Sequence, residues 1–232
     1  MQISSARITQ ASRENFVSLL LRTFRADLGP LDRIAGEDAL RQFFHHCMAR
    51  SEAAGFALQR EIIRFSFIAL HMGLFFDTDP LLDEVREGAL WSHPGVHPNV
   101  GLNRMFANAD LMIAEGLLGA DQGFTPGFPE ACAKAAGNDN GAGDPLERAR
   151  IICTETNPRR AAALGGPALD RALRAGWRDL EENHPRFRDH PLEWMICSVF
   201  LGHGFARNPL YSWVSWDIAQ GGLPAVRRRL HE

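Results

Sequence analysis

Apolar residues recur along most of the chain every three or four positions, the spacing of a helix that buries one face. No stretch alternates apolar and polar residues over enough positions to predict a β-strand. The pattern therefore predicts an all-α protein, a globule of many helices. The helices are expected at approximately residues 12–25, 36–54, 58–75, 81–90, 101–118, 129–136, 145–154, 167–182, 191–201, 209–219 and 224–230.

Capping residues mark several of these helix ends. Ser12 is a favourable N-cap for the first helix, and Gly55 is a favourable stop for the second. Asp144-Pro145 places an N-cap before a proline at the first helical position, where proline is well tolerated. The helix expected over 58–75 is apolar nearly all round, which predicts a central position covered by other helices.

A stretch rich in glycine and proline divides the chain. It covers Gly119 to Asp144 and ends in GNDNGAGD, a composition typical of a mobile linker. We therefore expect two helical halves, residues 1–136 and 145–232, joined by a linker at residues 137–144.

The two halves share one sequence motif. GLFFDTDPLL begins at Gly73, and GHGFARNPLY begins 129 positions later at Gly202. Without a gap, the glycine, a phenylalanine and the Asp/Asn-Pro-Leu triplet coincide, and together they specify a helix C-cap, a buried anchor and the next N-cap. The halves are either pseudo-repeats from an internal duplication or two unrelated corners that meet the same structural requirement.

The acidic residues of the first motif have two interpretations. Asp77 and Asp79 have the spacing of the first ligands in a calcium loop, but Pro80 and Leu81 stand where that loop needs an oxygen ligand and a glycine. Asp79 directly before Pro80 is also a good helix N-cap, and Asn208 would cap equally well in the second motif. We favour the cap.

The histidines offer a second candidate for chemistry. His93 and His97 have the spacing of a zinc-binding pair on a helix, but the prolines beside them prevent a regular helix, and no third ligand is evident. A surface loop is favoured, and a metal site is the alternative. His71 is interpreted as a core histidine or as one that reaches Asp77. No motif for a nucleophile or a cofactor occurs, so none is expected.

Charge and composition restrict the partners. The net charge is −3 and the arginines are spread along the chain, which gives no field for nucleic acid or an anionic membrane. The Arg227 to Arg229 triplet is expected near a helix C-terminus, where the dipole favours cations. The longest apolar stretch, Phe65 to Phe76, is too short to span a bilayer. With no signal peptide and no paired cysteine motif, the expected location is cytoplasmic.

Aromatic residues cluster near the C-terminus. Tyr211, Trp213 and Trp216 lie within YSWVSWD, and the two tryptophans are expected on one helical face. Tyrosine and tryptophan are the usual anchors of protein interfaces. The other interpretation is that these rings cover the core of the C-terminal half.

The first part of the chain resembles a family of uncharacterised small helical proteins encoded in bacterial type VI secretion effector clusters. The segments that carry this resemblance are ITQASRENF, LLLRTFRADL and the run from GEDALRQFF to HMGLFFDTDP. They cover roughly the first 85 residues. One position departs from the family, because Leu82-Asp83 stands where a proline–tryptophan pair is usual.

The resemblance implies a non-catalytic protein-binding accessory, either an effector adaptor or chaperone or an immunity protein. Its partner would be a secreted effector or a spike-associated protein, and its oligomeric state is open. One alternative is a toxin effector or small hydrolase that uses His71, Asp77, His93 and His97, with or without a metal. Another is a ligand-binding regulator with an apolar pocket between the halves. The residues expected at a protein interface are Phe76, Asp79, Pro80, Leu81, Phe205, Tyr211, Trp213 and Trp216.

Overall fold

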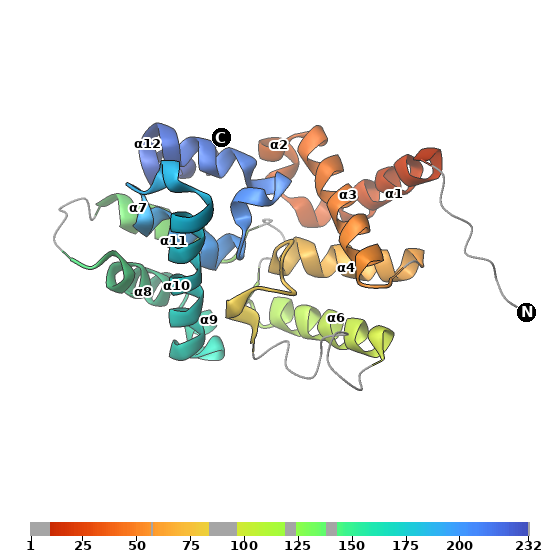
Figure 1. Cartoon of the computed structure of the whole chain (residues 1–232), viewed down its shortest axis with the longest axis horizontal. Helices are drawn as coiled ribbons and strands as arrows, with labels where there is room; N and C mark the ends of the chain where they lie inside the picture. Colours follow the sequence, from red (N-terminus) through yellow and green to blue (C-terminus); the bar gives the residue numbers. More distant parts are fainter. Residues whose placement is uncertain (1–9, 57, 84–96, 119–123, 138–142, 232) are drawn as a thin grey trace, which may run out of the picture.

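A computed structural model describes residues 10–56, 58–83, 97–118, 124–137 and 143–231, and all regular structure in these residues is helical (Figure 1). The all-α prediction is therefore confirmed. The α-helices are α1 Gln10–Leu28, α2 Leu31–Ala35, α3 Glu37–Ala53, α4 Gln59–Met72, α6 Pro98–Ala114, α7 Phe128–Gly137, α8 Pro145–Thr156, α9 Pro158–Leu164, α10 Gly166–Asn183, α11 Pro191–Leu201 and α12 Ser212–Leu230. The 3-10 turns are η1 Pro80–Leu82, η2 Pro185–Phe187, η3 Phe205–Arg207 and η4 Pro209–Tyr211.

The expected central helix, α4, packs against α1, α3 and α6. Figure 1 shows it between α3 and α6 in the half of the molecule that contains the N-terminus. Phe65 and Ile68 on this helix are fully buried. A helix without a polar face is thus covered on several sides, as its sequence predicts.

Several boundaries differ from those expected. The first helix begins at Gln10, so Ser12 lies within α1 and not at its N-cap. The helices α2 and α9 were not predicted, because five and seven residues are too few to display a helical period. The short helix expected at 81–90 is described only as far as η1 and Asp83, and its remainder lies outside the described residues. α12 breaks at Gly221 and Gly222, which matches the gap between the last two predicted helices.

Element boundaries recur in the two halves at one offset. Gly36 precedes α3 and Gly165 precedes α10, which is 165 − 36 = 129 positions, with φ/ψ of 79°/161° and 76°/152°. Gly73 and Gly202 end α4 and α11 at the same offset, 202 − 73 = 129. The order short helix, glycine, long helix, apolar helix, glycine corner and 3-10 turn is therefore found twice. Its origin in a duplication stays a prediction.

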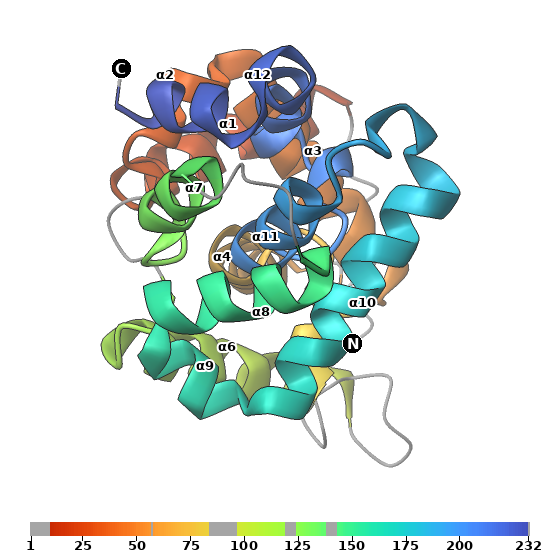
Figure 2. The same cartoon turned by 90° about the vertical axis from the view of Figure 1, so that its left-hand side faces the viewer.

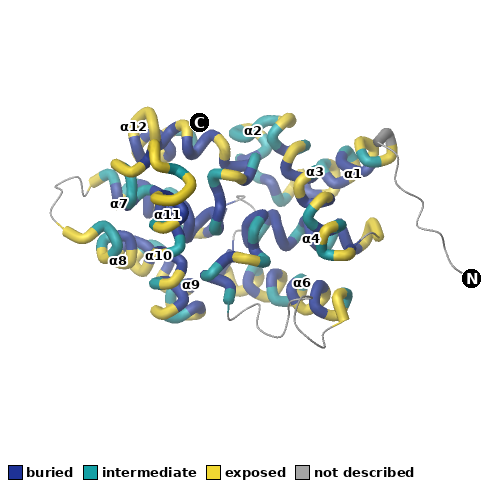
Figure 3. Tube along the Cα trace, in the orientation of Figure 1, coloured by how far each residue is buried: buried dark blue, intermediate teal, exposed yellow. Residues whose placement is uncertain are grey.

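The two halves share one hydrophobic core. Buried side chains from both halves form a single contiguous cluster, and Figure 3 shows the buried positions inside both groups of helices. The halves also contact each other reciprocally, α10 against η1 and α3 against η4. α7 precedes the predicted linker but packs against α8, α11 and α12 (Figure 2). The linker at residues 137–144 stays a prediction, because most of it lies outside the described residues.

None of the described helices is both long enough and apolar enough to cross a lipid bilayer.

Candidate functional site

The two glycine corners meet at the centre of the molecule. Gly73 and Gly202 have φ of +96° and +91°, a backbone conformation that other residues rarely adopt. A Cβ on Gly73 would lie 3.3 Å from the Cα of Gly202, and a Cβ on Gly202 would lie 3.3 Å from the Cα of Gly73. The C-terminal ends of α4 and α11 are thus in backbone contact. The repeated motif packs against its own second copy.

Asp79 joins the two corners. Its Oδ1 accepts a hydrogen bond of 2.9 Å from the Leu81 N–H, which confirms the predicted N-cap. Its Oδ2 accepts a bond of 2.8 Å from the backbone N–H of His203, which is 124 positions away in the chain. Asn208 caps the second turn in the same way, since its Oδ1 accepts from the Leu210 N–H at 3.1 Å. Only the aspartate also bonds the opposite corner through a carboxylate oxygen among the bonds that the described residues show.

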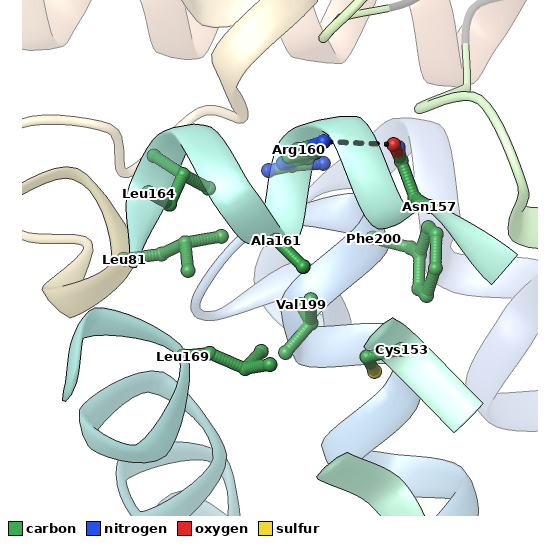
Figure 4. A pocket seen from close by; sticks show the side chains of 9 residues that line it. All are labelled: Leu81, Cys153, Asn157, Arg160, Ala161, Leu164, Leu169, Val199 and Phe200. Atoms are coloured by element: carbon green, nitrogen blue, oxygen red, sulfur yellow. Dashed lines mark hydrogen bonds between the residues drawn. The ribbon is translucent and has the colours of Figure 1, made fainter. Parts of the chain in front are cut away.

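Arg160, on α9, is the charged group nearest in kind to a functional residue here. It is 7% exposed, and its Nε and Nη1 have no hydrogen-bond partner among the described residues. Its backbone N–H donates to Asn157 Oδ1 at 3.1 Å, the bond drawn in Figure 4. A buried guanidinium with unused donors is costly, so its surroundings must compensate it.

Two small cavities adjoin Arg160. One is lined mainly by apolar side chains from η1, α8, α9, α10 and α11, including Leu81, Cys153 and Phe200 (Figure 4). The other lies at the ends of α4 and α11 and includes His71, Thr125 and Tyr211. Their interior spaces are about 20 Å³ and about 10 Å³, which leaves room for at most one water molecule each. Neither offers the pocket that a ligand-binding regulator would need.

The charge of Arg160 is balanced by its neighbours. Burial is the main cause that lowers the pKa of Arg160, to about 10, while the charges of Asp79 and Cys153 act in the opposite direction. Arg160 therefore stays protonated at neutral pH. The C-terminal ends of α4 and α11 carry the negative poles of their helix dipoles, and these also face the second cavity. The guanidinium thus offsets Asp79 and two helix ends, which disfavours an added cation.

The register of the halves shows where Arg160 departs from the pattern. The position 160 − 31 = 129 residues earlier is Leu31, which is fully buried at the start of α2. One half therefore combines Asp79 with Arg160, and the other combines Asn208 with Leu31. Sequence reasoning missed Arg160 because arginine is usually exposed. Extending the 129-residue alignment to Leu31 would have found it.

The predicted interface residues are mostly internal. Pro80 is half-buried and Trp216 is 64% exposed. Trp213 is 8% exposed, and its Nε1 donates to the carbonyl of Leu210 at 2.9 Å, so the two tryptophans lie in different environments although they are three positions apart. Trp216 is therefore the aromatic candidate that a partner could contact. The buried candidates are Phe76, Asp79, Leu81, Phe205, Tyr211 and Trp213.

The residues of the hydrolase alternative are dispersed over several elements. Asp77 pairs with Arg50 through a charged hydrogen bond. The His71 ring is half-buried, 4.6 Å from the ring of Phe67. His97 is exposed, and its Nδ1 accepts from the Asn99 N–H at 3.3 Å as the N-cap of α6. His93 lies outside the described residues, so the His93–His97 pair is not placed. Over the described ranges, no three His, Cys, Asp or Glu side chains gather as metal ligands.

A basic hollow lies at the end of α12. It is lined by Ala136 of α7 and by Pro224, Arg227, Arg228 and His231, and its volume is about 560 Å³. We call this surface the arginine hollow. The helix-dipole interpretation of the arginine triplet did not distinguish its members, because only the fold separates Arg229, which pairs with Asp217, from the other two.

Comparisons with protein-family models, with curated proteins and with solved structures find no match to this chain.

Proposed function

We propose that the chain is a non-catalytic protein-binding accessory of a bacterial type VI secretion or toxin cluster. It would hold a secreted effector or spike-associated protein for loading, as an adaptor or chaperone, or neutralise an effector as an immunity protein. The resemblance of roughly the first 85 residues supports the cluster. The exposed side chain of Trp216 is the observation that supports protein binding.

Trp216 has the properties of an interface anchor. It is 64% exposed on a long helix whose opposite face is buried, and Ser212, Ala219 and Gln220, its neighbours one turn away, are exposed as well. Tryptophan is strongly enriched among the residues that dominate binding energies, since its large ring loses little conformational entropy on burial. A partner that covered this ring would remove a large apolar area from water.

The helix that carries Trp216 is held firmly. The buried carboxylate of Asp217 accepts two hydrogen bonds from Arg229, of 2.6 Å and 2.8 Å, across the break at Gly221 and Gly222. The Arg229 guanidinium also lies 5.8 Å from the ring centre of Trp213. A rigid support of this kind lowers the entropic cost of binding through the adjacent exposed ring.

The test begins with the tagged full chain purified from its native host, with partners identified by mass spectrometry. The partner is then purified, and its affinity is measured for the wild type, Trp216→Ala and the control Leu111→Ala. Leu111 is 57% exposed on α6, a different helix. We expect Trp216→Ala to weaken binding tenfold or more, on the order of 1.4 kcal/mol, and Leu111→Ala to leave it unchanged.

Recovery of the chain alone, or equal binding by both variants, would contradict the proposal. Growth of cells that co-express the partner separates the two accessory roles, because only an immunity protein relieves the partner's toxicity. Growth arrest by the chain itself, abolished by His97→Ala, would instead support the toxin alternative.

A further inference from the structure

The arginine hollow combines positive charge with a small apolar floor. Arg227 and Arg228 are exposed and take part in no ion pair among the described residues. His231, exposed at the end of α12, adds a third nitrogen base. Ala136 and Pro224 supply apolar surface, and no acidic side chain lines the hollow in the part of the chain that is described.

Neighbouring cations show what is unusual about this pair. Arg229 is neutralised by Asp217, and Lys134 on α7 is paired with Glu155 at 2.5 Å. The C-terminal dipole of α12 corresponds to about half a negative charge, which cannot offset both remaining guanidinium groups. A concave surface with a local positive charge therefore remains on a chain whose net charge is −3.

The hollow is continuous with the surface around Trp216. Exposed positions follow α12 from Trp216 through Gln220 and Gly221 to the two arginines. A Cβ on Gly221 would lie 3.9 Å from Arg228 Nη2, so this guanidinium reaches back towards the break in the helix. Eleven helical positions separate Trp216 from Arg227, at most about 16 Å along a straight helix. An extended peptide spans that distance with about five residues.

We infer that the arginine hollow binds an acidic peptide segment of the protein partner. This inference rests on the proposed function and adds the chemistry of the partner. Carboxylates of the segment would take charge-assisted hydrogen bonds from Arg227 and Arg228. An apolar side chain about five residues away would reach Trp216. Nucleic acid is disfavoured because two arginines and a histidine on one helix end are far from a long basic track, and no aromatic ring lines the hollow.

The direct test measures binding of fluorescein-labelled hexaglutamate to the full chain by fluorescence anisotropy. Hexaglutamine is the uncharged control peptide. The test variant is Arg227→Glu/Arg228→Glu, and the matched control is Arg174→Glu/Arg178→Glu, two exposed arginines on α10 outside the hollow. Circular dichroism confirms that each variant is folded.

We expect hexaglutamate to bind at least tenfold more tightly than hexaglutamine. The affinity should fall at least tenfold in Arg227→Glu/Arg228→Glu, stay unchanged in Arg174→Glu/Arg178→Glu, and fall as salt is raised. Equal affinity for both peptides, or equal loss in both variants, would overturn the inference. So would a labelled single-stranded DNA oligonucleotide that binds the same arginines more tightly than hexaglutamate does.

The two proposals fail separately. If the purified partner needs Trp216 while hexaglutamate does not bind, the accessory role stands and the acidic-segment inference is wrong. If hexaglutamate binds at Arg227 and Arg228 while no partner is recovered from the host, the hollow is an acidic-peptide site and the accessory role is contradicted.

Discussion

Gly73 and Gly202 lie back to back where α4 and α11 end, so a Cβ on either residue would come within 3.3 Å of the other's Cα. Both have positive φ, and both stand 129 positions apart in the repeated motif. The motif therefore has glycine twice for two reasons, namely the backbone conformation at each corner and the contact between the corners.

Alanine substitutions separate these two reasons. Gly36 and Gly165 have similar φ/ψ values, but nothing lies closer than 3.9 Å to a Cβ at either position. Gly36→Ala and Gly165→Ala should cost about 1–3 kcal/mol in free energy of unfolding, from the backbone alone. Gly73→Ala and Gly202→Ala should cost about 1 kcal/mol more, because backbone atoms must move apart. Urea unfolding measures all four, and equal losses would refute the corner contact.

The second prediction concerns the acceptors of Asp79. Asp79→Asn leaves one carbonyl oxygen for two backbone N–H donors, and it removes the negative charge near Arg160. The expected loss is about 3–5 kcal/mol in free energy of unfolding. Asp144→Asn is the control, because Asp144 is an exposed N-cap that bonds only the Leu146 N–H among the described residues. It should change stability by less than about 0.5 kcal/mol, since asparagine caps equally well.

Much of the fold was predictable because local chemistry determines it. Helical periodicity located the long helices, and an Asp or Asn before proline located the caps, as the bond from the Leu210 N–H to Asn208 shows. The bond from the His203 N–H to Asp79 was not predictable, because it joins residues 124 positions apart. The different environments of Trp213 and Trp216 were missed for the same reason, since helical spacing places both on one face but distant elements decide which ring they cover.

A double-mutant cycle tests whether Asp79 and Arg160 act as a pair. Arg160→Leu introduces the residue found 129 positions earlier at Leu31, and it leaves Asp79 without its counter-charge. Each single substitution should be strongly destabilising, by about 3–5 kcal/mol. The double variant Asp79→Asn/Arg160→Leu restores the Asn–Leu combination of the other half. It should lose at least about 1 kcal/mol less than the sum of the singles, and strict additivity would show that the two charges are independent.

The cysteines are expected to be unreactive in the folded protein. All four are free and buried, and burial raises the pKa of Cys132 and of Cys153 to about 12. At pH 8 the thiolate fraction of these two groups is then on the order of 10⁻⁴. Iodoacetamide should leave the native chain unlabelled and add four labels in guanidinium chloride, as read by intact mass. Rapid labelling of native protein would mean that the core opens.

The last prediction separates the two tryptophans of α12 by stability instead of binding. Trp213 is 8% exposed and makes ring contacts with Phe124, whereas Trp216 is 64% exposed. Trp213→Ala should therefore lower the free energy of unfolding by about 3–5 kcal/mol, because it removes a buried ring and leaves a cavity. Trp216→Ala should change it by less than about 0.5 kcal/mol. Thermal and urea unfolding of both variants provide the measurement. A large loss for Trp216→Ala would show that its ring is covered within the chain, and its role as the anchor for a partner would then be untenable.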